Sequence, residues 1–253
     1  MFLDVLGAKN IIRSGDLAGL WEALSSGFDL LRQCDSPSGN PISQWEMKTF
    51  SDNVLLAFSI ETDDSEIELA VIFDCVSPFL FHMACRGFFV RGGLVVGSLC
   101  IDVNRVLGEA LLSAYELEQK ACYPRVVVDL KIVDLLRAHI KRPHFPNSAW
   151  KSFFLQDCEK QVFVNYLQSQ ILRDDEDGAE VVVERIEQHR EQIEKQLREN
   201  EAHGPVRSKY CWLAAYHNHF VSDLKKSGYR NGANFISERL FVPNPKHLFH
   251  GLE

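Results

Sequence analysis

The sequence predicts an α+β fold, in which an antiparallel or mixed sheet is covered by helices. Three observations predict it: apolar strand-like runs alternate with helical patterns over residues 1–140, a hairpin pattern surrounds residue 52, and charged helical patterns follow residue 178. With 253 residues, 46% of them hydrophobic and 25% charged, the chain is long enough to bury a full core. One domain with a helical extension fits this length better than two equal domains.

The N-terminal segment predicts a strand, a helix and a hairpin. Residues 1–7, "MFLDVLG", form a short strand that ends in a glycine, and residues 10–33 carry apolar residues at the three- and four-residue spacing of a helix. Residues 34–41 predict a loop, and the apolar runs flanking Asp52 predict paired strands. Only three residues precede Asp4, which leaves open whether the first strand continues upstream from another start codon.

The next hundred residues continue the alternation. Residues 66–88 are apolar nearly all round, which predicts a buried helix that Pro78 kinks or interrupts. The further predicted elements are a strand with a glycine pair (88–99), a helix (106–121), a buried strand (125–130) and a helix (131–140) closed by Pro143. The order is βαββαβα followed by another strand, and a central hairpin in this order is typical of the ferredoxin-like class.

The pattern of predicted elements changes after residue 150. Residues 153–157 and 161–167 still predict strands, and the acidic segment 173–178 marks a boundary. We therefore predict a first domain at 1–172 and a mainly helical extension at 173–253. Two helical patterns, 179–201 and 208–228, are expected to pair as an αα-hairpin that either covers part of the sheet or forms a dimer contact.

Composition excludes several classes of protein. The seven cysteines are scattered and never form a C-x-x-C pair, which argues against a disulfide framework and a zinc site and favours a reducing cytoplasm. No run reaches the roughly 18 apolar residues of a membrane span, and Asp4 interrupts the N-terminal apolar run, unlike a secretory signal. The net charge of −8 disfavours nucleic acid as a partner.

Asp4 and Asp52 are the residues on which a functional hypothesis rests. Asp4 ends the first predicted strand, just before a glycine loop and a helix, and Asp52 lies in the hairpin of the neighbouring strands. Either aspartate alone is more often a turn or cap residue. As a pair beside a helix N-terminus, they suit two Mg²⁺ ions that activate a hydroxyl and grip a triphosphate.

Four segments resemble a known family. "FLDVLG", "KTFSDNVLLAF", "RGGLVVG" and "VLGEALLSAYELE" are similar, in this order, to the motifs of class III nucleotidyl cyclases, and the similarity covers roughly residues 2–130. Within that family the chain looks most like the bacterial pyrimidine nucleotide cyclases of antiphage signalling, because of "AYELE", "YPR" and "YCWLAAYHNH". The resemblance implies a ferredoxin-like cyclase sheet with a C-terminal helical extension.

The resemblance also implies an activity. UTP or CTP would become the 3′,5′-cyclic monophosphate and pyrophosphate, in sites formed between the subunits of a homodimer, and a separate effector protein would receive the product. Asp4 and Asp52, with the backbone at Val5, would hold two Mg²⁺ or Mn²⁺ ions. The substrate-binding residues that we expect are Lys48, which would read the base, and Arg105, Lys9 and Arg91.

The chain departs from the family pattern in two places. Ser51 replaces the usual glycine before the second aspartate, a change that need not disturb metal binding. Leu112 and Glu116 stand near the places where mammalian-type cyclases carry an asparagine and an arginine that steadies the transition state. Those roles are therefore unassigned, and Arg91 or Arg125 is the alternative source of positive charge.

The base preference follows from hydrogen-bond donors. The side chains of Lys48 and Arg105 can only donate hydrogen bonds, whereas the amino group of adenine requires a hydrogen-bond acceptor. ATP is therefore disfavoured as the substrate. Asp102 and Asn104 lie near enough to invert this argument. The alternatives are a purine cyclase, a non-catalytic dimeric nucleotide-binding module, and a palm-type polymerase or cyclic dinucleotide synthase. A metal clamp of the two histidines in "YHNHF" is disfavoured, because side chains two apart do not share a helix face.

Overall fold

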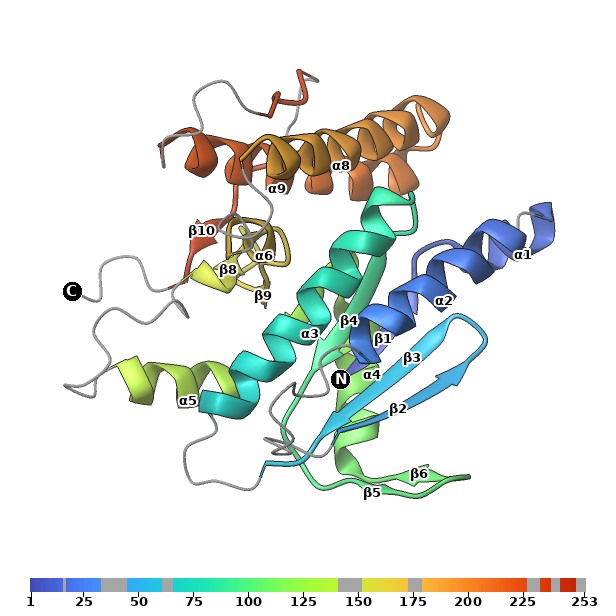
Figure 1. Ribbon diagram of the computed structural model, residues 1–253, viewed down its shortest axis with the longest axis vertical. Helices are drawn as coiled ribbons and strands as arrows, with labels where there is room; N and C mark the ends of the chain where they lie inside the picture. The colour runs from blue at the N-terminus through green and yellow to red at the C-terminus, as the bar shows by residue number, and fades with distance from the viewer. Residues whose placement is uncertain are drawn as a thin grey trace.

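The computed structural model describes residues 1–15, 17–32, 45–60, 66–140, 152–172, 179–226, 233–237 and 242–248. The predicted α+β class is confirmed: helices cover a mixed eight-stranded sheet with the order β10-β8-β9-β7-β4-β1-β3-β2 (Figure 1). Its strands are β1 (Phe2–Val5), β2 (Trp45–Phe50), β3 (Asn53–Phe58), β4 (Val90–Leu94), β7 (Val126–Val128), β8 (Phe154–Gln156), β9 (Val162–Val164) and β10 (Lys246–His247). A separate two-stranded ribbon pairs β5 (Cys100–Ile101) with β6 (Val106–Leu107).

Helices lie on both faces of the sheet. They are α1 (Ala8–Ser14), α2 (Leu17–Arg32), α3 (Glu66–Cys85), α4 (Glu109–Lys120), α5 (Leu130–Ile140), α6 (Gln168–Leu172), α8 (Ala179–Glu199) and α9 (Gly204–Lys226). Leu3 and Val5 of β1 belong to the main hydrophobic core together with residues of α2 and α3. Because side chains alternate along a strand, Phe2 and Asp4 point to the opposite face. There Phe2 meets Tyr115 of α4 edge to face.

The N-terminal half of the sheet is a four-stranded antiparallel unit. The strand order β4-β1-β3-β2 arises from the chain order β1, α1, α2, β2, β3, α3, β4. Register places Asp4 directly opposite Asn53 of β3 on one side and opposite Arg91 of β4 on the other. The predicted hairpin around Asp52 is confirmed as the β2–β3 pair. This unit therefore brings the end of β1 next to the β2–β3 turn.

Several predicted bounds are wrong for local reasons. The single helix expected at 10–33 is two helices, because Gly15 ends α1 in the left-handed conformation with φ 88°. Pro78 does not interrupt helix α3, which continues through it as one element, since burial on nearly every side holds the helix by packing. The helix expected from 106 begins at Glu109, because residues 106–107 pair as β6. The predicted loop 34–41 and acidic segment 173–178 lie outside the described residues.

The C-terminal helices pack on the sheet and on α3. Helices α8 and α9 form the predicted αα-hairpin, and α8 also contacts α3 (Figure 1). Trp212 of α9 packs edge to face on Phe163 of β9 and stacks on Tyr123. The division predicted at residue 172 stays a prediction, and the main core includes residues from both sides of it. Within the described ranges, no helix is both long enough and apolar enough to cross a lipid bilayer.

Candidate functional site

The structure brings Asp4 and Asp52 together. Asp4 lies near the C-terminal end of β1, and Asp52 lies in the turn that joins β2 to β3, next to the Asn53 that pairs with Asp4. Their carboxyl groups are close enough to repel each other and to share a hydrogen bond when one of them is protonated. The two acidic side chains come from segments 48 residues apart in the chain, so the juxtaposition is a product of the sheet topology.

Two residues with positive φ shape this corner. Gly7 has φ 78°, which lets the chain turn directly from β1 into α1. Ser51 has φ 56°, a conformation that glycine adopts far more readily. The Ser51 hydroxyl donates a hydrogen bond to Oδ1 of Asp52 over 3.0 Å. Ser51 therefore orients the Asp52 carboxylate from a strained backbone position.

Arg91 and Glu118 complete the cluster. The Arg91 Nε donates to Oδ2 of Asp4 over 2.9 Å and lies 2.7 Å from Oε1 of Glu118, which projects from α4. The Glu118 side chain is only 1% exposed, and Gln119 donates to its other oxygen over 2.6 Å. Two carboxylates, those of Asp4 and Glu118, thus share one guanidinium group, and the carboxylate of Asp52 lies beside that of Asp4. Sequence reasoning missed Glu118, although it lies inside the motif "AYELE".

The electrostatics of the cluster follow from this charge imbalance. Burial raises the pKa of Asp4, the Arg91 guanidinium opposes the rise, and repulsion by Asp52 adds to it. Burial also raises the pKa of Glu118, against the pull of Arg91 and with a further contribution from Asp4. A partly buried site with more carboxylates than cations is a site that a further cation would stabilise.

Glycine at position 93 lets α4 reach the sheet. A Cβ at this position would overlap the backbone carbonyl of Ala114 and would stand 2.9 Å from Cβ of Leu117, both on α4. The absent side chain allows α4 to lie directly on β4. Glu118 follows Leu117 in the same helix, so Gly93 sets the depth at which its carboxylate meets Arg91.

The predicted base-contacting residues Lys48 and Arg105 both interact with Asp102. Lys48 lies opposite Leu55, which lies opposite Phe2, so Lys48 shares a face with Asp4. The positive charge of Lys48 attracts the carboxylate of Asp102, which lies in the turn between β5 and β6. Arg105 donates to Oδ2 of Asp102 through both Nε and Nη2, at 3.0 and 2.8 Å.

The remaining predicted residues lie elsewhere. Lys9 is exposed on α1, and the side chain of Val5 is buried in the core on the opposite face from Asp4. Arg125, the alternative source of positive charge, is fully buried and paired with Asp157 and with Glu159, the latter at 3.0 Å. It therefore serves the packing between β7 and the β8–β9 turn rather than the Asp4 corner.

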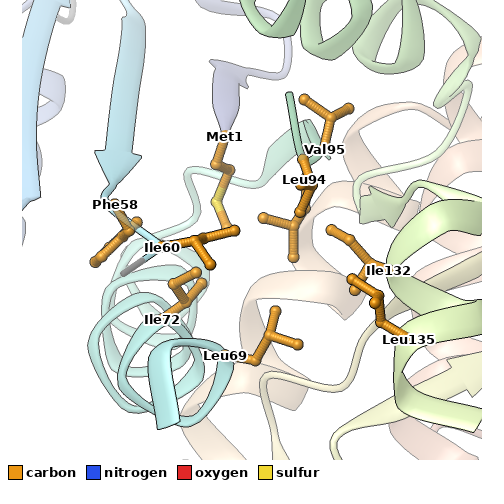
Figure 2. Close-up of a pocket in the computed structure, with 10 residues that line it drawn as sticks. Met1, Phe58, Ile60, Leu69, Ile72, Leu94, Val95, Ile132 and Leu135 are labelled. Atoms are coloured by element: carbon orange, nitrogen blue, oxygen red, sulfur yellow. The ribbon is translucent and has the colours of Figure 1, made fainter. Parts of the chain in front are cut away.

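A small pocket at the ends of the central strands is lined by apolar residues. Figure 2 shows it between the ends of the central strands and helices α3 and α5, with a volume of about 50 Å³ and walls that include Met1, Leu94 and Ile132. Its lining is apolar, so it is expected to stay dry. The nearby N-terminal ammonium donates to the carbonyl of Leu56 over 2.7 Å, and burial lowers its pKa to about 5. This cavity is a packing feature.

The histidines of α9 point to different partners, as their spacing predicts. His217 is buried against His189, whereas His219 lies beside Asp223 and His247 on another side of the helix. The spacing of four residues between His219 and Asp223 was a detectable signal that sequence reasoning missed.

Comparisons with family models, curated proteins and solved structures found no match to this chain.

Proposed function

We propose that this protein is a nucleotidyl cyclase that converts UTP or CTP into the 3′,5′-cyclic monophosphate and pyrophosphate. The observation that carries the proposal is the meeting of Asp4 and Asp52 at the end of β1. The order β4-β1-β3-β2 with βαββαβ connectivity is the ferredoxin-like arrangement expected from the cyclase resemblance, and it supports the proposal. In the reaction, the ribose 3′ oxygen attacks the α-phosphorus, loses its proton, and displaces pyrophosphate.

The donor set fits divalent cations. Asp4 and Asp52 offer carboxylate oxygens, the ligand type that Mg²⁺ and Mn²⁺ prefer, in a site where negative charge exceeds positive. When bound, such ions lower the pKa of the attacking hydroxyl and offset the phosphate charge. The chain's own contribution is to hold both carboxylates at one corner, with Ser51 orienting Asp52 and Arg91 bridging Asp4 to Glu118.

Lys48 and Arg105 are the proposed base contacts. Lys48 lies two residues along the strand direction and two strands across from Asp4, which standard sheet spacings convert to roughly 12 Å. A nucleoside triphosphate bound between these residues would place its base towards Lys48 and its phosphates towards Asp4 and Asp52. A groove of about 530 Å³ includes Glu46, the ion-pair partner of Lys48, in its walls, but it lies at the Phe58 end of β3, away from Asp52.

Exposed apolar side chains support a homodimer. Phe50 is 83% exposed, Leu107 68% and Leu112 65%, and they lie at the β2–β3 turn, on β6 and on α4. Exposed apolar side chains of this size are typical of interaction surfaces. Phe50 lies opposite Asn53, the register partner of Asp4, so a second copy seated on Phe50 would cover the Asp4 corner. We further propose that the enzyme is cytoplasmic and that its product is a second messenger, read by a separate effector protein in antiphage defence.

A non-catalytic nucleotide-binding module is the second candidate. It is favoured by the ion pair between Arg91 and Asp4, which occupies an oxygen that a metal ion would need. It is also favoured by Leu112 and Glu116, which are exposed on α4 and offer no positive charge at the expected transition-state positions. In this reading the dimer binds nucleotide without turnover.

The deciding experiment is incubation of the purified protein with each of the four labelled nucleoside triphosphates and Mn²⁺, followed by separation of the products. We expect cyclic UMP or cyclic CMP from the wild-type protein and none from Asp52→Ala. The matched control is Asp134→Asn, an exposed aspartate of α5 paired with Arg137. It should keep full activity, because it lies outside the Asp4 corner.

Each other outcome points to a named alternative. Cyclic GMP or cyclic AMP would indicate a purine cyclase and would refute the donor argument for Lys48 and Arg105. Linked dinucleotides would indicate a polymerase or cyclic dinucleotide synthase. Absence of product with all four nucleotides would support the binding module, and equal activity of Asp52→Ala and wild type would remove Asp52 from the site.

A further inference from the structure

We propose that His219, Asp223 and His247 form a binding site for a transition-metal ion of the Zn²⁺ class, a site that goes beyond the proposed cyclase. One ligand atom from each residue lies within 4.8 Å of the other two. The Nε2 atom of His219 lies 3.5 Å from Oδ2 of Asp223, and Nε2 of His247 lies 2.7 Å from the same oxygen. Among the described residues, these three are the one such group of histidine, cysteine or acidic side chains.

The spacing of the three atoms suits a tetrahedral ion. Zinc bonds to nitrogen and oxygen of about 2.0–2.1 Å imply ligand atoms on the order of 3.3 Å apart. The two histidine nitrogens lie 3.5 and 2.7 Å from Oδ2 of Asp223, on either side of this value, and the ligand atoms of the two histidines lie within 4.8 Å of each other. Two imidazoles and one carboxylate are a donor set for zinc and its neighbours, whereas Mg²⁺ prefers oxygen alone.

Hydrogen bonds alone do not satisfy every polar atom of the His219, Asp223 and His247 cluster. His247 and Asp223 make a good hydrogen bond without any metal. The Nε2 atom of His219, however, is buried and has no hydrogen-bond partner of acceptable geometry in the described part of the chain. A buried polar nitrogen without a partner is costly. An ion between the three side chains would use this nitrogen.

The surroundings leave room for a fourth ligand. The cluster opens onto a groove of about 810 Å³ whose walls also include Gln156, Gln168 and Lys226. The Lys226 ammonium lies 2.9 Å from Oδ1 of Asp223, whereas both histidines contact Oδ2. Its side chain is 73% exposed, so solvent screens its charge from the site. Three protein ligands with an open position are typical of zinc sites that exchange a water or a small ligand.

The site would fasten the C-terminal segment to the fold. His219 and Asp223 lie one turn apart on α9, whereas His247 belongs to β10, which adds only two residues to the edge of the sheet beside β8 (Figure 1). So short a strand contributes few backbone hydrogen bonds. A shared ion would therefore hold residues 242–248 against α9, and its binding should raise the thermal stability of the chain.

The test is a zinc titration of the tag-free, full-length protein against a chromophoric chelator, without nucleotide. We expect one equivalent bound by the wild type and by His203→Gln, whose histidine is exposed in the turn before α9. His247→Gln and Asp223→Asn should lose affinity beyond the roughly 10–100-fold that removal of an outer-shell partner costs. Zinc should raise the melting temperature of the wild type and of His203→Gln, and leave that of His247→Gln unchanged.

Two results would overturn the site. One is a wild-type protein that binds no zinc at micromolar concentration. The other is equal affinity in wild type, His247→Gln and Asp223→Asn, which would place the bound zinc on exposed cysteines such as Cys158. Circular dichroism of both variants verifies that they are folded. Because nucleotide is absent throughout, neither result depends on cyclase activity.

Discussion

Acid should unfold this protein through two buried histidines, and His217 allows the size of the effect to be worked out. His217 and His189 are both fully buried, with Nδ1 atoms 3.1 Å apart. The Nε2 of His217 must donate its proton to the carbonyl of Asn234, since a carbonyl only accepts. The Nδ1 of His217 is then an acceptor, which makes His189 the donor between them, and Tyr166 donates its hydroxyl proton to Nε2 of His189.

This chain of donors has no place for another proton. Protonation of His217 at Nδ1 would set it against the N–H of His189. Burial lowers the pKa of His217 to about 4; the hydrogen bond to the Asn234 carbonyl and the charge of Glu187 oppose this shift, and Arg190 adds to it. Burial also lowers the pKa of His189, and the neighbouring His217 adds to the effect. Both imidazoles therefore fold as neutral groups.

The sign of the pH effect follows from proton counting. The unfolded chain takes up protons on His217 below a pKa of 6.5, whereas the folded chain does so only below about 4, so stability is complete above pH 6.5 and falls as the pH is lowered towards 4. Between about pH 7.5 and 4.5 this linkage amounts to about 2.5 kcal/mol for His217 alone. The raised pKa values of Asp4 and Glu118 act in the opposite direction, because those groups stabilise the fold as they protonate.

The assay is urea unfolding followed by circular dichroism at both pH values, with a chelator present. His217→Gln keeps an amide donor for Asn234 and removes the titration, so its stability should fall by about 2.5 kcal/mol less than that of wild type over this pH range. His203→Gln, which changes an exposed histidine, should behave as wild type does. An identical loss in wild type and His217→Gln would refute the account of the buried pair.

Three further stability predictions can be checked by the same urea unfolding at neutral pH. Gly93→Ala should destabilise the fold by roughly 1–3 kcal/mol by pushing α4 from the sheet, whereas the control Gly97→Ala, whose Cβ would stand 3.4 Å from its nearest neighbour, should cost less. Ser51→Gly should be neutral or stabilising by up to about 1 kcal/mol, because relief of the positive φ outweighs the lost hydrogen bond. Arg125→Met should cost roughly 3–5 kcal/mol by leaving the buried Asp157 charge unpaired, and adding Asp157→Asn, which removes the charge but keeps an acceptor for the Glu159 and Gln161 amides, should restore part of the loss.

The sequence predicts those parts of the fold that local patterns control. The hairpin at Asp52 follows from two apolar runs with a short turn, and the αα-hairpin follows from helical periodicity around a glycine and a proline at 204–205. The break at Gly15 was missed because apolar spacing continues across it. Helix α3 passes Pro78 because burial on nearly every side outweighs the local preference of proline.

Some residues of the candidate site could be predicted from local sequence patterns, and others could not. Asp4 and Asp52 could be paired from the sequence, because each lies at the end of a recognisable strand and the strands are neighbours in the expected topology. Glu118 could not be assigned to the site, because its position depends on how closely α4 approaches β4, and Gly93 controls that distance through the absence of a side chain. The left-handed turn at Ser51 explains in the same terms why glycine is the expected residue there.

The contact between Arg91 and Asp4 depends on register, which local patterns do not fix. These residues lie directly opposite each other in the β1–β4 pair, so their side chains share a face and can form the 2.9 Å ion pair. A slip of one residue would turn Arg91 to the core face, away from Glu118 and Asp4. The zinc candidate shows a stronger form of this limit. The spacing of His219 and Asp223 is visible along one helix, but His247 joins them through β10, a strand too short to produce a pattern, so only the closed tertiary structure brings the third ligand to the other two.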